Sequence, residues 1–142
     1  MQEIGLCPQI DLELKIPPAV QPTFERIFSK LRKAVSGVHA LVLVGADGEL
    51  VDHAATRLDF DVSVFAAEYA TLIRIAQRTA QDTSMGDLTE YVAVADAGVI
   101  VARRLSSNHF AIALCSRQEQ LGRLRYELKV GTRDLDKHLM SS

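Results

Sequence analysis

The chain has 142 residues, of which 48% are hydrophobic and 24% are charged, and its net charge is −2. This length corresponds to about one domain with a core of its own, and the composition excludes a disordered chain. The weak negative charge and the 6% aromatic content argue against nucleic-acid binding, which needs surplus basic groups and stacking side chains.

The remaining composition indicates a cytoplasmic chain. Cys7 and Cys115 lie far apart and lack metal-ligand spacing, which favours reduced thiols. The N-terminus does not resemble a signal peptide, and no segment approaches the roughly 20 apolar residues of a membrane span.

Residues 1–21 are predicted to form an N-terminal extension. Ile10, Leu12, Leu14 and Ile16 alternate with charged residues, which is the pattern of a strand with one buried face. Prolines directly after residue 16 end the pattern. Two interpretations stay open: a loosely ordered tail, and a strand added to a sheet edge of its own or another subunit.

Residues 22–140 are predicted to form one domain that begins with a helix and a hairpin. Apolar residues at helical spacing predict a helix over residues 23–36, with Gly37 as its C-terminal cap. Residues 38–44 are nearly all apolar, which predicts a strand covered on both faces. Asp47-Gly48 predicts a hairpin turn in which both residues have positive φ, and residues 49–55 form the returning strand.

A second helix is predicted over residues 61–80, with Asp61 as its N-terminal cap. Its expected core face consists of Phe65, Tyr69, Leu72, Ile73 and Ala76. The apolar surface is wider than one buried face requires. The helix is therefore either enclosed within its own domain or shared with a second subunit, its alanines allowing close approach.

Three short strands and a third helix complete the domain. The strands cover residues 91–95, 99–104 and 110–115, joined by short polar turns. Ser116 and Glu119 form a predicted capping box before a leucine-striped helix, which Gly131 is expected to interrupt or end. The predicted fold is of the α/β (α+β) class, with the order α-β-β-α-β-β-β-α and one sheet with helices on both faces.

The sequence contains no convincing catalytic, cofactor or metal motif. Its four histidines lack the spacing of metal pairs. A Cys115–His109 nucleophile pair would need a third orienting group. The segment from Gly45 to Gly48 lacks the Lys and Ser/Thr of a phosphate-binding loop. We therefore expect a non-enzymatic protein with no catalytic residue, no cofactor and no metal.

Several stretches together resemble the roadblock (dynein light chain) domain family. They are residues 42–51 (VLVGADGELV), residues 65–72 (FAAEYATL), the three-strand meander, and residues 120–125 (QLGRLR). The resemblance covers about residues 23–139 and implies a roadblock/profilin-like, five-stranded antiparallel sheet with one helix on one face and two on the other.

The resemblance also implies a homodimer formed through the middle helix and the third strand. The interface residues it suggests are Ala66, Ala67, Ala70, Ile73, Arg74, Tyr91, Val92 and Ala93. Bacterial and archaeal members resemble regulators of Ras-like small GTPases, including polarity and motility switches, which the paired middle helices contact. The partner-binding residues carried over are Glu68, Thr71, Arg74, Ile75 and Arg78, as contacts and not as a catalytic finger.

The leading hypothesis is thus a homodimeric regulator of a small GTPase, activating or scaffolding. A second is a structural adaptor of a motor or multiprotein complex that is indifferent to the bound nucleotide. A third, a small-molecule sensor, would need a pocket with convergent polar groups, and the apolar strands show no such cluster.

Overall fold

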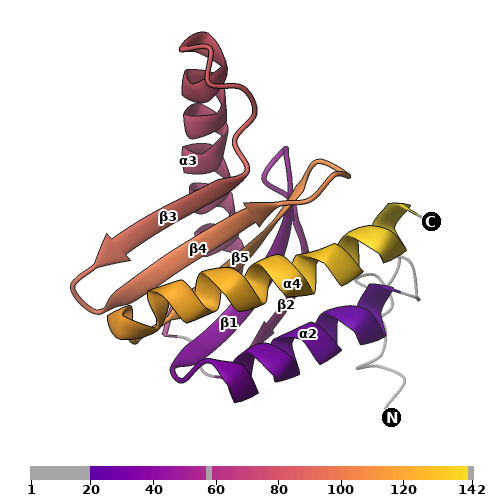
Figure 1. Cartoon of the computed structure of the whole chain (residues 1–142), viewed down its shortest axis with the longest axis vertical. Helices are drawn as coiled ribbons and strands as arrows, with labels where there is room; N and C mark the ends of the chain where they lie inside the picture. The colour runs from indigo at the N-terminus through magenta and orange to yellow at the C-terminus, as the bar shows by residue number, and fades with distance from the viewer. Residues whose placement is uncertain (1–19, 57–58, 141–142) are drawn as a thin grey trace.

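The computed structural model describes residues 20–56 and 59–140, so the predicted strand over residues 10–16 lies outside it. The elements confirm the predicted order α-β-β-α-β-β-β-α. They are α2 (Val20–Ala34), β1 (Val38–Gly45), β2 (Leu50–Ala55), α3 (Val62–Asp82), β3 (Glu90–Ala95), β4 (Gly98–Arg104), β5 (His109–Cys115), a short 3-10 turn (Gln118–Gln120) and α4 (Leu121–Met140) (Figure 1).

The five strands form one antiparallel sheet in the order β2-β1-β5-β4-β3. Helices α2 and α4 lie side by side on one face, and α3 lies on the other (Figure 1). We call these the α2/α4 face and the α3 face. Strand β1 is paired on both sides and covered on both faces, as its apolar sequence predicted. Strands β2 and β3 form the edges of the sheet.

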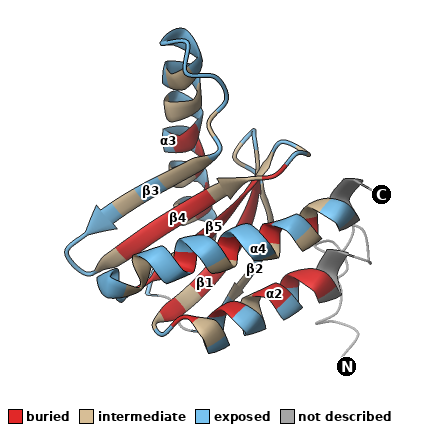
Figure 2. Cartoon of the chain, in the orientation of Figure 1, coloured by how far each residue is buried: buried red, intermediate tan, exposed pale blue. Residues whose placement is uncertain are grey.

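The larger core lies between the sheet and the α2/α4 layer. Phe24 and Leu31 of α2 and Leu124, Leu128 and Leu135 of α4 are buried there. The strands contribute Leu41 and Leu43 together with small residues of β5, which let the helices sit close to the sheet (Figure 2). This apolar layer accounts for most of the large, fully buried side chains.

Helix α4 continues through Gly131, so the predicted interruption is wrong. A Cβ atom at Gly131 would lie 2.8 Å from Cγ2 of Ile27 on α2. The missing side chain therefore permits the two helices to approach, and that packing outweighs the low helix propensity of glycine.

The predicted capping box is also wrong. Helix α4 begins at Leu121, after a 3-10 turn whose N-cap, Arg117, makes no capping hydrogen bond with its side chain. Arg117 instead pairs with Glu119, at 2.6 Å between Nη2 and Oε2. The Ser116 hydroxyl hydrogen-bonds Nε2 of His39 at 3.0 Å. Both predicted capping side chains are thus occupied by other partners.

The β1–β2 hairpin differs from the predicted turn in one respect. Only Gly48 has a positive φ (+90°), and Asp47 does not. The N–H of Gly48 donates to the carbonyl of Gly45 at 3.0 Å, which is the pattern of a turn followed by a left-handed glycine. Helix α2 ends at Ala34, two residues before the predicted end, so Gly37, with φ +91°, lies in the turn that leads into β1 and not directly at the helix end.

Candidate interaction surface

Helix α3 is positioned by its cap and by a small-residue face. The N–H of Ser63 donates to Oδ1 of Asp61 at 2.8 Å, which confirms the predicted N-cap. Ala66, Ala70 and Ile73 are buried against Val42 and Val44 of β1 and the neighbouring strands. Alanines at the contact bring the helix close to the sheet.

This packing revises the assignment of the two apolar stripes on α3. Ala66 is 0% exposed within a single subunit, and Ala70 and Ile73 are also buried, so these three face their own sheet and not a second subunit. Leu72 was expected in the core, yet it is 45% exposed. Of the expected core face, Ile73 is buried, and Phe65 and Tyr69 are half-buried and pack against the core, whereas Ala66 and Ala70 complete that face in place of Leu72.

The outward side of α3 carries a continuous stripe of exposed residues. Val64, Glu68, Thr71, Ile75 and Arg78 follow each other at spacings of three and four, which places them on one face of the helix. Val64 is 52% exposed and Ile75 59%. We call these five residues the outer stripe. Four of them were predicted to bind a partner, and the structure places all four at the surface.

The fifth predicted partner-binding residue, Arg74, is exposed at the side of this stripe. Its Nη1 donates to the carbonyl of Ala46 at 3.4 Å, and its Nη2 donates to Oγ1 of Thr71 at 3.5 Å. The guanidinium is thereby directed towards the β1–β2 turn. Arg78 forms no such contact with the described residues.

An aromatic row runs along one flank of α3. The ring centroids of Phe60 and Phe65 are 5.3 Å apart, and those of Phe65 and Tyr69 are 5.0 Å apart. Leu72 lies on the same flank by its spacing. Burial raises the pKa of Tyr69, and the nearby Tyr91 hydroxyl of β3 adds to that effect. This flank therefore points towards the β3 side of the sheet.

Strand β3 is an edge strand with apolar residues on both faces. Within the described chain it pairs with β4 alone. Tyr91 and Ala93 are half-buried on the α3 face, whereas Val92 and Val94 are exposed on the α2/α4 face. Ala67, the remaining predicted interface residue, is exposed on α3. An open backbone edge with apolar neighbours is a typical pairing site for a further strand.

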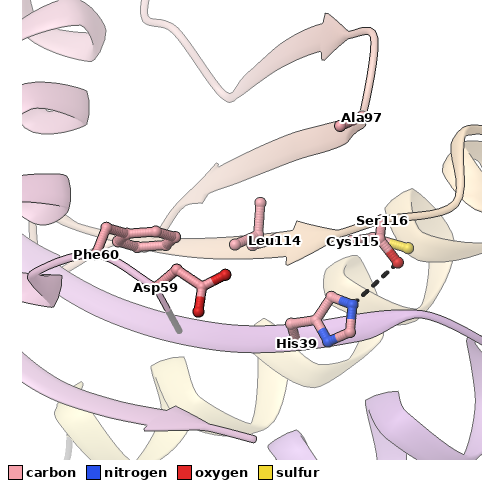
Figure 3. A pocket seen from close by; sticks show the side chains of 7 residues that line it. All are labelled: His39, Asp59, Phe60, Ala97, Leu114, Cys115 and Ser116. Carbon is pink, nitrogen blue, oxygen red and sulfur yellow. Dashed lines mark hydrogen bonds between the residues drawn. The ribbon is translucent and has the colours of Figure 1, made fainter. Parts of the chain in front are cut away.

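A pocket of about 420 Å³ opens near the start of the aromatic row (Figure 3). Phe60, Leu114 and Ala97 line it together with Asp59, and His39 and Ser116 close one end. Figure 3 shows the His39–Ser116 hydrogen bond at this end and the Asp59 carboxylate between Phe60 and His39. The pocket thus has an apolar wall, a hydrogen-bonded polar pair and one carboxylate.

The structure does not bring Cys115 and His109 together, because they lie at opposite ends of β5. The Cys115 thiol is buried and donates to the carbonyl of Ser36 at 3.5 Å. His109 Nδ1 instead contacts Ser107. Across residues 20–56 and 59–140, no group of three or more His, Cys, Asp or Glu side chains is placed to hold a metal ion. No helix in the same ranges is long and apolar enough to cross a membrane.

No known family model matches the sequence, and neither does any curated protein. Solved structures are similar over most of the chain. The gliding protein MglB from Thermus thermophilus is 11% identical, with a TM-score of 0.78 over 89% of this chain and 96% of that one. MglB from Myxococcus xanthus is 15% identical, with a TM-score of 0.79 over 89% and 93%.

A Roadblock/LC7 domain from Streptomyces avermitilis is 20% identical, with a TM-score of 0.72 over 81% of this chain and 96% of that one. At these identities the likeness establishes the three-dimensional arrangement alone. The sheet order, the single helix on one face and the helix pair on the other agree with it. The chain has the roadblock fold.

Proposed function

We propose that the chain is a homodimeric, non-enzymatic regulator of a Ras-like small GTPase, which it contacts through the outer stripe of paired α3 helices. The observation that carries the proposal is that α3 has one face buried in the subunit core and another, partly apolar face exposed. Ala66 and Ala70 are buried in the subunit core, while Val64 and Ile75 are exposed among Glu68, Thr71 and Arg78. An apolar centre with a charged rim is the usual anatomy of a protein-binding surface.

The dimer would form through the β3 edge and the aromatic flank of α3. Pairing of β3 with its copy satisfies the open backbone edge and extends the sheet across the two-fold axis. Leu72, Tyr91 and Ala93 then become covered by the partner. Ala66, Ala70 and Ile73, which the family resemblance implied for the interface, are left out because they are buried in the subunit core. Tyr91, Val92 and Ala93 are retained. The fold likeness to MglB, including one solved as "MglB with tetrameric arrangement", agrees with self-association.

The proposed mechanism is stabilisation of one conformation of the GTPase switch region. Arg78 and Arg74 act as contacts, and the GTPase supplies the catalytic groups. Such a regulator must bind one nucleotide state more tightly than the other, because only a difference in affinity shifts the switch equilibrium. The resemblance of the sequence to roadblock GTPase regulators and the fold shared with MglB support this assignment.

The test is the affinity for Ras-like GTPases of the same genome, loaded with a GTP analogue or with GDP, measured by calorimetry. We expect tighter binding of one state and at least tenfold weaker binding by Ile75→Asp, or about 1.4 kcal/mol. Val130→Asp, at an exposed valine of α4 on the opposite face, is the matched control. Equal affinity for both states would contradict the regulator and favour the nucleotide-indifferent adaptor.

A further inference from the structure

The charges of this chain are unevenly distributed among its elements. Helices α2 and α4 contain nine basic and four acidic residues, a net charge of +5, although the whole chain has −2. The remainder of the chain therefore carries −7. The α2/α4 layer is therefore the basic part of an acidic chain, and this asymmetry does not follow from the proposed GTPase contact on the opposite face.

Six of the nine basic residues, all exposed, recur at helical spacing along the two helices. Arg123, Arg133 and Lys137 of α4 and Arg26, Lys30 and Lys33 of α2 are exposed. We call these six residues the cationic crest. Tyr126, 63% exposed, lies between the α4 members at the same helical spacing.

Two acidic residues of α4 lie beside the α2 part of this crest, because Arg26 and Lys30 line the same groove as they do. Glu127 and Asp134 line the groove between α4 and α2. Oδ1 of Asp136 accepts a hydrogen bond from the N–H of Ser106 at 2.9 Å, on the β4–β5 turn. Within the described residues, Arg133 and Lys137 have no ion-pair partner, and of the crest only Arg123 does, through Glu127 at 3.8 Å. The crest thus keeps a surplus of positive charge, with six cations beside two carboxylates.

We propose that the cationic crest docks the protein on an anionic lipid surface. Long, flexible cations around an exposed Tyr on a helix pair match the interface of a bilayer, where aromatic rings sit at the headgroup level. In the proposed dimer, a sheet continuous through β3 places both α2/α4 layers on the same side. This placement of the two layers rests on the dimer of the proposed function. Both crests then face the membrane, and both outer stripes face away from it.

The experiment is flotation of the full chain with vesicles of phosphatidylcholine alone or of phosphatidylcholine with phosphatidylglycerol. We expect binding to the anionic vesicles alone, weakened by added salt. Each cation near such a surface strengthens binding about fivefold, so Lys33→Glu/Arg133→Glu is expected to weaken it by about 25-fold or more. Arg74→Glu/Arg78→Glu removes the same charge from the α3 face and should leave vesicle binding unchanged.

Circular dichroism of each variant verifies that it is folded. Equal binding to both kinds of vesicle, or anionic binding that the crest variant retains, would overturn the proposal. Capture by polyglutamate without binding to anionic vesicles would also overturn it, because the crest would then be a site for acidic polypeptides. GTPase affinity measured in parallel separates the two proposals: crest variants should keep it, and Arg74→Glu/Arg78→Glu should lose it.

Discussion

Replacing Leu72 with Asp should separate dimerisation from folding. Leu72 is 45% exposed in the single subunit, so little of the core depends on it. Full burial of a leucine contributes about 1.5–3 kcal/mol, so covering the exposed part contributes about 1 kcal/mol per subunit and about 2 kcal/mol per dimer. Leu72→Ala should therefore raise the dimer Kd by about thirtyfold. Leu72→Asp should raise it much further, because a carboxylate would lose its water without gaining a partner.

The control for this prediction is Ala70→Arg, two residues away. Ala70 is buried against the subunit's own sheet, so a long cation there must overfill the core and lose its hydration. We expect Ala70→Arg to lower the free energy of unfolding of the subunit by several kcal/mol, about the size of an uncompensated buried charge.

The assay is sedimentation velocity over a range of concentrations, together with thermal unfolding. Leu72→Asp should sediment as a folded monomer with nearly unchanged unfolding, whereas Ala70→Arg should be unstable at every concentration. A Leu72→Asp protein that keeps the wild-type dimer Kd would refute the assignment of this flank to the interface.

Three further predictions concern single positions. Gly131→Val should lower the free energy of unfolding by about 1–3 kcal/mol in denaturant titration, since its Cβ would press on Ile27; no change would contradict the close packing of α2 and α4. Burial raises the pKa of Asp52, so the charged carboxylate destabilises the fold. The free energy of unfolding that the protonated carboxyl contributes is therefore present at low pH and is lost as the pH rises through the folded pKa. Asp52→Asn should thus raise Tm at neutral pH, with a smaller gain in acid. Val92→Lys on the β3 edge should shift the dimer towards monomer in light scattering, and an intact dimer would exclude that edge.

The order and type of every described α-helix and strand could be predicted from the sequence, because apolar periodicity and turn residues are local signals, whereas the 3-10 turn over Gln118–Gln120 could not. Which of the two apolar stripes of α3 is buried could not be predicted from the sequence. Both of its stripes are apolar, and the choice of Ala66 and Ala70 over Leu72 for the core depends on how closely the helix meets β1. The predicted capping box likewise does not form, because Glu119 makes an ion pair with Arg117, and residue spacing alone does not reveal this contact.

The outer stripe was predictable in part, since Glu68, Thr71 and Ile75 recur at helical spacing. The cationic crest was not, because it depends on α2 and α4 lying side by side, with Asp136 bonded to the β4–β5 turn. The sequence shows these charges as a mixed helical surface. Their separation requires the packing of two helices that are distant in the chain.

The central claim is that exposed residues of α3 recognise the nucleotide state of a Ras-like GTPase. The most direct measurement is the Kd of the wild-type chain for such a GTPase in its GTP-analogue and GDP forms, repeated with Ile75→Asp. The account predicts unequal affinities and a loss of the tighter binding in the variant. Equal affinities, or a variant that binds as the wild type does, would contradict it.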